Sequence, residues 1–173
     1  GGLPDSVPLS VPALLARRDE WVSSYDDAGQ VRWAADAGIE VARGVGRLCG
    51  ERQVQVRGED SVREITARHA VVVATGSTPV MHDGVAELHP WTSRDATGVQ
   101  EVPSSIAVVG GGVVAAEAAL WLAGLGAQVT MLVRGDRLLS RFEAFAGELV
   151  TAGLQRAGVE VRFGAEAFPL GRE

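Results

Sequence analysis

The spacing of apolar residues divides the chain into an N-terminal part of helices and short strands and a C-terminal part in which strands and helices alternate. Val11 to Gly38 has apolar residues at mixed helical spacings, which predicts helix. The polar run 26–29 predicts an interruption, after which a second helix covers 30–37. Gly38 is suited to end that helix, because glycine readily adopts the left-handed conformation that follows helix C-termini.

Short runs of alternating or continuous apolar residues follow these helices. The alternation over 53–57 is typical of a half-exposed strand, and 58–60 predicts a turn. Residues 70–74 are all apolar and lead into Thr75-Gly76-Ser77-Thr78-Pro79, which favours a strand buried on both faces. The other predicted strands of this region are 39–42 and 63–67.

The stretch 79–103 has no clear hydrophobic period and contains Pro79, Pro90 and Pro103. This composition predicts a connection between two domains, with a short helix near 93–99.

Beyond Ser105 the pattern changes to two consecutive β-α-β units, which predict an α/β fold with a parallel sheet. The last helix has Phe142, Phe145, Ala146 and Leu149 on one face, and Gly158 is expected to end it. The expected elements, strand and helix in turn, are 106–109, 113–123, 129–133, 142–157 and 159–163.

Composition excludes several classes of function. The chain has 173 residues, a net charge of -6 and 46% hydrophobic residues, which argues for a packed core and against a nucleic-acid surface. All 16 basic residues are arginine, so a catalytic lysine is absent. The lone Cys49 cannot form an intramolecular disulfide, and no metal site is predicted.

Nothing in the sequence predicts a membrane protein. The long apolar stretch from Ile106 to Val133 contains Glu117 and several glycines, which fit strand-turn-helix-turn-strand better than a membrane span. The first residues have neither the basic region nor the apolar run of a signal peptide, and they lack an initiator Met. We therefore expect a cytoplasmic protein whose sequence begins inside a longer chain.

The candidate chemistry lies in the turn after the first strand of the C-terminal part. Gly110, Gly112 and Ala115 match the pattern G-x-G-x-x-A. The first glycine permits the sharp turn, the second lets a pyrophosphate approach the backbone, and the alanine lets the helix close on the strands. The phosphates would lie at a helix N-terminus, where N–H groups and the helix dipole favour anions. Gly111, Val113 and Val114 complete the predicted contact set; the alternative is a glycine turn that serves packing alone.

The end of the second strand bears on the choice of cofactor. An acidic residue there would bind the ribose of NAD, but Val133 is followed by Arg134 and then Arg137. Guanidinium pairs well with a 2′-phosphate, so NADPH is favoured over NADH. Two alternatives stay open: both arginines are solvated surface residues, or Asp136 binds the ribose of NAD.

With these motifs the sequence resembles the class I pyridine nucleotide-disulfide oxidoreductases, which include lipoamide dehydrogenase, glutathione reductase and mercuric reductase. Residues 74–79 look like the segment that ends the family's FAD domain, and 110–117 match its nucleotide fingerprint. The resemblance implies part of an FAD-binding domain with helix and β-meander in 1–79, a connection in 80–104, and the first portion of a Rossmann-like βαβαβ NAD(P)-binding domain in 105–173.

The resemblance also implies roles for individual residues. Thr75 and Gly76 would approach the flavin of the parent protein, Arg134 and Arg137 would hold the 2′-phosphate, and Glu117 would orient the nicotinamide and flavin without reacting itself. Each role has an alternative: Thr75 and Gly76 form a strand-end turn with a purely structural role, and Glu117 is a solvated carboxylate on the helix face.

The sequence also departs from the family. A second glycine fingerprint does not precede Gly110, only Cys49 stands for the redox pair of cysteines, and Val113 occupies a position that is often tyrosine. We therefore expect a fragment of a flavoprotein oxidoreductase that passes hydride from NAD(P)H to FAD and electrons to a disulfide or other acceptor. This chain is expected to be inactive alone, and its parent to be a homodimer through a region absent here. The alternatives are a non-catalytic nucleotide-binding module, a truncated product that is inactive without the missing regions, and an NAD(P)H:acceptor reductase without redox cysteines.

Overall fold

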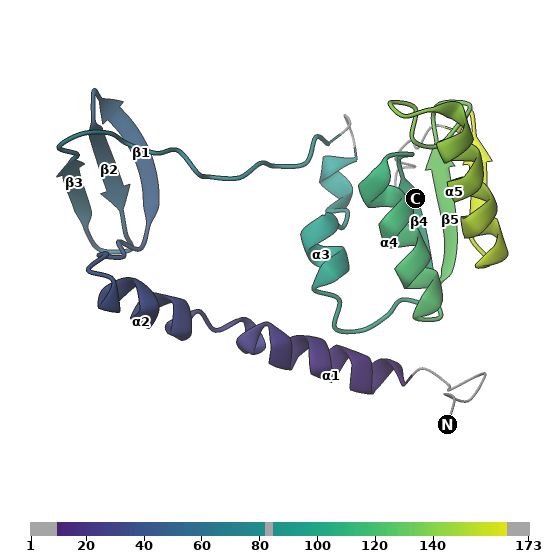
Figure 1. The fold of residues 1–173 in the computed structure, drawn as a ribbon, viewed down its shortest axis with the longest axis horizontal. Helices are drawn as coiled ribbons and strands as arrows, with labels where there is room; N and C mark the ends of the chain where they lie inside the picture. Colours follow the sequence, from purple (N-terminus) through teal and green to yellow (C-terminus); the bar gives the residue numbers. More distant parts are fainter. Residues whose placement is uncertain (1–9, 82–84, 166–173) are drawn as a thin grey trace. The chain divides into compact units, whose positions relative to one another are not determined.

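The computed structural model describes residues 10–81 and 85–165. The chain divides into two compact units, one of Leu15–Thr78 and the other of Pro79–Glu173 together with the chain before Leu15. Each unit has its own three-stranded sheet (Figure 1).

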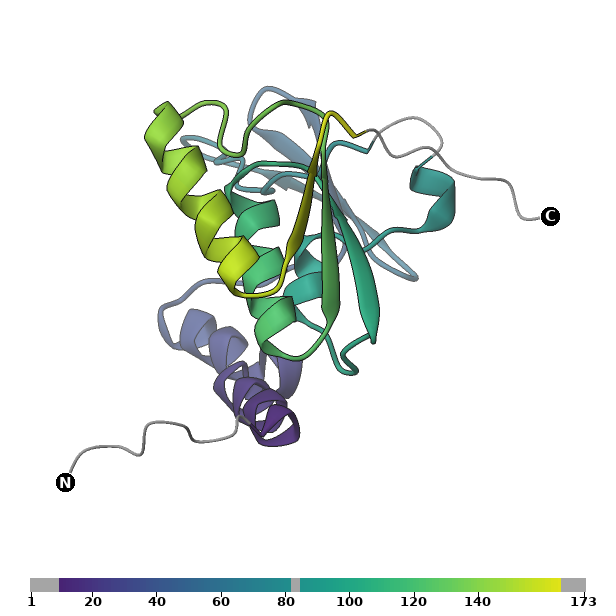
Figure 2. The same ribbon diagram turned by 90° about the vertical axis from the view of Figure 1, so that its right-hand side faces the viewer.

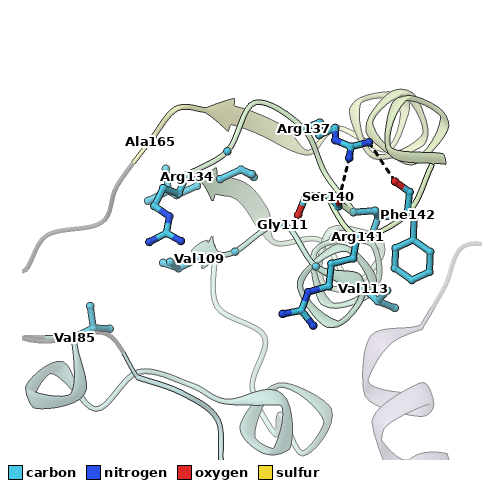
Figure 3. A pocket seen from close by; sticks show the side chains of 16 residues that line it. Val85, Val109, Gly111, Val113, Arg134, Arg137, Ser140, Arg141, Phe142 and Ala165 are labelled. Atoms are coloured by element: carbon cyan, nitrogen blue, oxygen red, sulfur yellow. Dashed lines mark hydrogen bonds between the residues drawn. The ribbon is translucent and has the colours of Figure 1, made fainter. Parts of the chain in front are cut away.

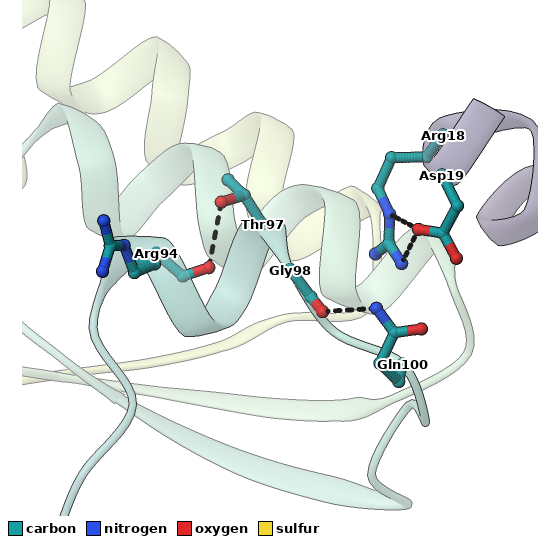
Figure 4. Close-up of polar contacts among 6 residues, drawn as sticks. All are labelled: Arg18, Asp19, Arg94, Thr97, Gly98 and Gln100. Carbon is teal, nitrogen blue, oxygen red and sulfur yellow. Dashed lines mark hydrogen bonds and ion pairs between the residues drawn. The ribbon is translucent and has the colours of Figure 1, made fainter. Parts of the chain in front are cut away.

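The N-terminal helical region consists of α1 (Val11–Trp21), the 3₁₀ turn η1 (Ser23–Tyr25) and α2 (Ala28–Asp36). The interruption predicted at 26–29 therefore begins earlier than expected, and α2 begins two residues earlier. All three residues of η1 have positive φ angles between 52° and 63°. Residues with a Cβ atom disfavour this left-handed conformation. This left-handed turn separates the two helices. Arg18 pairs with Asp19 within α1, with 2.7 Å between Nη2 and Oδ1 (Figure 4).

An antiparallel meander follows, with the strand order β1-β2-β3. The alternating run was correctly predicted as β2, and β3 is shifted by one residue from its prediction. The prediction of a strand at 39–42 was wrong: this segment pairs with no strand among the described residues, and Ile39 and Val41 are exposed. The strand β1, which was not predicted, contains two glycines and an arginine and has no clear hydrophobic period. The strands are β1 (Val45–Gly50), β2 (Gln53–Arg57) and β3 (Val62–Thr66).

The prediction of a buried strand at 70–74 is also wrong. The backbone there is irregular, and Val72 and Val73 are 85% and 64% exposed. An apolar run becomes a buried strand only when neighbouring strands accept its backbone hydrogen bonds and cover its side chains. Within the described part of the chain, no strand pairs with this segment.

Two short helical elements precede the second sheet: η2 (Ala86–Leu88) and α3 (Ser93–Thr97). The short helix expected near 93–99 is thus confirmed, and its Ala96 is buried. At its end, the hydroxyl of Thr97 donates to the carbonyl of Arg94 at 3.1 Å (Figure 4). The side-chain amide of Gln100 donates to the carbonyl of Gly98, also at 3.1 Å.

The C-terminal unit has the predicted alternation of strands and helices. Its strands are parallel and lie in the order β4-β5-β6. Figure 2 shows both helices on the same face of this sheet. As expected, Gly158 ends the second helix: its φ is 85°, and the next N–H, of Val159, donates to the Leu154 carbonyl at 3.0 Å. The elements are β4 (Ser105–Val109), α4 (Val113–Gly124), β5 (Gln128–Val133), α5 (Ala144–Arg156) and β6 (Glu160–Phe163).

The main core of the described residues lies between this sheet and its two helices. Leu122 of α4, Met131 of β5 and Leu138 of the loop after β5 are almost fully inaccessible. The second helix was expected to begin at 142, but α5 begins at Ala144 and Phe142 precedes it. Phe145 and Leu149 on one face of α5 are exposed, as is Phe142. The opposite face, with Leu154 and Gly147, packs inward. The strands β4 and β5, whose carboxyl ends lead into the glycine turn and the loop after β5, are therefore packed against this core.

Candidate nucleotide-binding site

The turn from β4 to α4 has the geometry that its glycine pattern predicts. Gly110 has a φ of 127°, which a side chain would disfavour, and its N–H donates to the Leu132 carbonyl at 3.0 Å. Helix α4 then begins after Gly112, and the first helical bond runs from Ala116 N–H to the Gly112 carbonyl at 3.0 Å. The N–H groups of the first three helical residues therefore precede the helical ladder and are available to an anion.

The three glycines of the turn differ in the space around them. A methyl group placed on Gly112 would have no neighbour within 4 Å, so the backbone there is open to a ligand. A methyl group on Gly111 would lie 2.8 Å from Val133 Cγ1 and 3.4 Å from Leu138 Cδ2. Gly112 thus provides open space, while Gly111 provides close packing against the end of β5 and the loop after it.

A cavity of about 810 Å³ lies beside this turn, between the ends of the strands and the loop that follows β5. We call residues 134–142 the arginine loop. Its Arg134, Arg137 and Arg141 line the cavity together with the glycine turn (Figure 3). Three guanidinium groups give the cavity a positive rim, which suits a ligand with several phosphates.

Most predicted contact residues are brought together at this cavity. Its lining includes Val133 and Val113 besides the residues named above, whereas Val114 and Ala115 lie outside the lining. Val114 is exposed on α4, and Ala115 lies behind the turn, its Cβ 3.7 Å from the Cβ position of Gly110. The small size of Ala115 is therefore used for helix closure, as its place in the pattern indicates. The predicted residues in the lining are Gly110, Gly111, Gly112, Val113, Val133, Arg134 and Arg137.

The remaining predicted residues lie elsewhere. Glu117 is exposed on α4 and is outside the lining of the cavity. Thr75 and Gly76 belong to the other unit, in the irregular segment described above, where Gly76 has a φ of 71°. These two residues alone do not form an enclosed flavin site.

Sequence reasoning missed Arg141 and Ser140, which also line the cavity. Their position depends on how the arginine loop folds back, and the loop has no hydrophobic period that would reveal this. The available signal was the density of arginines, three in the eight residues 134–141.

The match to a family model covers residues 11–168 and carries the description "Pyridine nucleotide-disulphide oxidoreductase". The chain belongs to this family. Its members combine a pyridine nucleotide with a flavin, and the resemblance seen in the motifs is thereby confirmed.

Two curated relatives illustrate the membership. Dihydrolipoyl dehydrogenase of Chlorobaculum tepidum is 35% identical over 160 residues, which is 89% of this chain and 33% of the relative. Mercuric reductase of Shigella flexneri is 32% identical over 166 residues, which is 94% of this chain and 29% of the relative. The chain therefore spans about a third of the length of these relatives.

The solved structure of LpdA from Mycobacterium tuberculosis shares the fold. It superposes with a TM-score of 0.72 at 23% identity, over 94% of this chain and 37% of that chain. The mixed architecture of antiparallel meander and parallel sheet is therefore shared with this solved structure.

The described residues contain neither a membrane-spanning helix nor a cluster of metal-ligating side chains. None of the helices there is long and apolar enough to cross a membrane. No group of three or more His, Cys, Asp or Glu side chains in that part of the chain is placed to hold a metal ion.

Proposed function

We propose that this chain is the portion of a flavoprotein oxidoreductase that binds NADPH. The pyrophosphate would lie on the N–H groups at the start of α4, against the open backbone of Gly112. The adenosine 2′-phosphate would lie at the arginine loop, where Arg134 directly follows β5. The observation that carries the proposal is the cavity itself, because an open glycine turn and three arginines border one space.

Preference for the 2′-phosphate rests on the residues at the end of β5. Val133 is buried and carries no carboxylate, so the position that would bind an NAD ribose is apolar. Arg134 is exposed beside it and lines the cavity. A guanidinium in this place favours a doubly charged phosphate over a hydroxyl group.

The activity that we propose for the parent protein follows from its family. NAD(P)H would supply a hydride to FAD, and the reduced flavin would supply electrons to a disulfide or other acceptor. This chain would contribute the nucleotide site, with Thr75 and Gly76 as part of a flavin site that other regions of the parent complete. The isolated chain is proposed to be inactive, and the parent to be a cytoplasmic homodimer.

The proposal is tested by calorimetric titration of the purified chain with NADPH and NADH, beside the variant Arg134→Glu. We expect tighter binding of NADPH by about tenfold or more, since charge-assisted hydrogen bonds contribute roughly 1.5–3 kcal/mol. The variant should lose or reverse this preference, because it places a carboxylate where the phosphate would lie. Failure of a demonstrably folded chain to bind either nucleotide would contradict the proposal.

A further inference from the structure

Helix α5 has a glycine at the point where it packs against the arginine loop. Gly147 is buried, and a methyl group there would overlap the carbonyl oxygen of Leu138 and lie 3.3 Å from its carbonyl carbon. Backbone atoms in a packed core cannot give way as the end of a flexible side chain can. The contact is particular to this glycine, because a methyl group on Gly153 of the same helix would meet only Arg156 Nη2, at 3.9 Å.

The contact falls on a peptide group that also reaches the glycine turn. The Leu138 carbonyl and the Leu139 N–H belong to one planar trans peptide group, so they point in opposite directions. The carbonyl lies against Gly147, and the N–H donates to the Gly111 carbonyl at 2.8 Å. One rigid peptide group therefore lies between α5 and the turn.

The hydrogen bond to the turn fixes a second peptide group. The Gly111 carbonyl and the Gly112 N–H share one plane, so a bond that holds the carbonyl also sets the direction of the N–H. Gly112 directly precedes α4 and has the open backbone where the pyrophosphate would lie. A donor stabilises an anion best when its direction is set before binding. A displacement at Gly147 would therefore reach a proposed phosphate donor.

The loop is held from several sides and cannot simply move away from α5. Leu138 is 0% exposed within the core. Arg137 closes the loop on itself: its Nη2 donates to the Ser140 carbonyl at 2.8 Å, and its Nη1 donates to the Phe142 carbonyl at 3.2 Å (Figure 3). Leu139 has a φ of 50°, a strained value that persists only where surrounding contacts impose it. A methyl group at the α5 contact would therefore displace the Leu138–Leu139 peptide group.

From this arrangement we infer that Gly147 is a positioning residue of the nucleotide site, which sets the direction of the Gly112 N–H through the Leu138–Leu139 peptide group. The inference rests on the proposed function and adds to it a residue of α5 that lies outside the cavity lining. Its effect on binding passes through two planar peptide groups and the hydrogen bond between them.

The experiment titrates the full 173-residue chain with adenosine 5′-diphosphate by calorimetry, because this compound carries two phosphates and no nicotinamide. The test variant is Gly147→Ala. Gly153→Ala is the matched control, since it makes the same change in the same helix at an open position. Leu154→Ala controls for stability, because it removes a buried side chain of α5 about two helical turns beyond Gly147. Thermal unfolding followed by circular dichroism gives the folded fraction of each variant.

We expect Gly147→Ala to lower the affinity for adenosine 5′-diphosphate by about tenfold or more, because a hydrogen bond to a charged group is misdirected. Hydrogen exchange followed by NMR should be faster at the Leu139 amide of this variant, whose bond to the turn is weakened. Gly153→Ala and Leu154→Ala should keep the wild-type affinity, although Leu154→Ala unfolds at a lower temperature.

A measurement on the wild-type chain tests the inference even if Gly147→Ala does not fold. Coupling between two events is reciprocal, so a Leu139–Gly111 bond that supports binding must itself be strengthened by binding. Saturating adenosine 5′-diphosphate should therefore slow hydrogen exchange at the Leu139 amide severalfold. The amide of Ala157 at the end of α5 is the internal control, because helix ends open locally, and its exchange should stay unchanged.

Three results would overturn the inference while leaving the proposed function intact. They are wild-type affinity in a folded Gly147→Ala, an equal loss of affinity in Leu154→Ala, and exchange at the Leu139 amide that adenosine 5′-diphosphate does not slow. The second result would make the effect one of general stability. If the wild-type chain does not bind adenosine 5′-diphosphate, the nucleotide site fails and the inference with it.

Discussion

At the scale of single residues, the glycine turn combines two requirements that the motif alone does not separate. Gly111 is small because Val133 and Leu138 pack against it, and its carbonyl accepts a hydrogen bond from Leu139. Gly112 is small although the protein leaves space beside it. Gly111 therefore stabilises the fold, whereas the open space at Gly112 is what the proposed binding of a nucleotide requires.

This difference predicts opposite outcomes for the two alanine substitutions. Gly111→Ala should lower the free energy of unfolding by about 1–3 kcal/mol, because the added methyl overpacks a filled site. Gly112→Ala should change stability by no more than about 0.5 kcal/mol, since its φ of -86° suits alanine, but it should weaken nucleotide binding. Urea unfolding and NADPH titration measure both quantities. Equal destabilisation by the two substitutions would contradict the assignment.

The residues of the turn were predictable because each role follows from a fixed spacing along the chain. Gly110, Gly112 and Ala115 are set by the sharp turn, the open backbone and the helix closure. Arg141 was not predictable in this way, because its position in the cavity depends on the buried Leu138 and on the two carbonyl contacts of Arg137. Such contacts leave no period in the sequence.

At the scale of elements, α3 shows how a five-residue helix is stabilised at its start. The backbone N–H and the hydroxyl of Thr92 both donate to the Asp95 carboxylate, at 2.7 and 2.8 Å. These hydrogen bonds lower the pKa of Asp95 below its ordinary value of 3.8, and the bond from the backbone N–H has the larger effect. The helix packs by its buried Ala96, and residues 98–104 connect it to β4.

The lowered pKa predicts an acid-sensitive helix. A carboxyl group whose pKa is depressed by folding stabilises the folded state above its unfolded pKa, and the stabilisation is lost as pH falls through the folded pKa. We therefore expect α3 to be fully stabilised above pH 3.8 and to loosen progressively below it. NMR titration of the Asp95 carboxyl and of the α3 amides measures this. In Asp95→Asn the amides should lose this pH response; its persistence would show that another group causes it.

The type of each element was predictable where a segment with a long periodic pattern packs or pairs with another segment of the same chain, as in β4 to β6 and their helices. They were not predictable where pairing decides the outcome. The apolar run 70–74 has no paired strand within the described residues and is irregular, whereas the glycine-containing β1 is a strand because β2 pairs with it. Hydrogen-bond partners, which the local sequence does not specify, outweighed propensity in both cases.

At the scale of the whole molecule, the chain carries a family fold over about a third of its relatives' length. In the described part of the C-terminal unit, β4 and β6 are the two edge strands of the parallel sheet. Phe145 and Leu149 are also exposed on α5, as is Phe142 just before it. Unpaired strand edges and exposed apolar faces both favour association.

We therefore predict that the isolated chain associates as its concentration rises. Sedimentation velocity over a tenfold concentration range should show a shift from monomer to larger species, and Phe145→Glu should reduce that shift by removing exposed apolar area. The matched control is Leu120→Glu, at an exposed leucine of α4. A sharp monomeric boundary at every concentration would contradict the prediction.

The central claim is that the turn between β4 and α4 binds the phosphates of a pyridine nucleotide. The most direct measurement is an NMR titration of the isotopically labelled chain with NADPH, followed at the backbone amides. The account predicts that the largest, saturable shifts occur at Gly112 to Ala115 and at Arg134, with α2 and the β1–β3 sheet nearly unchanged. Saturable shifts confined to other residues, with the amides of the glycine turn unmoved, would contradict it.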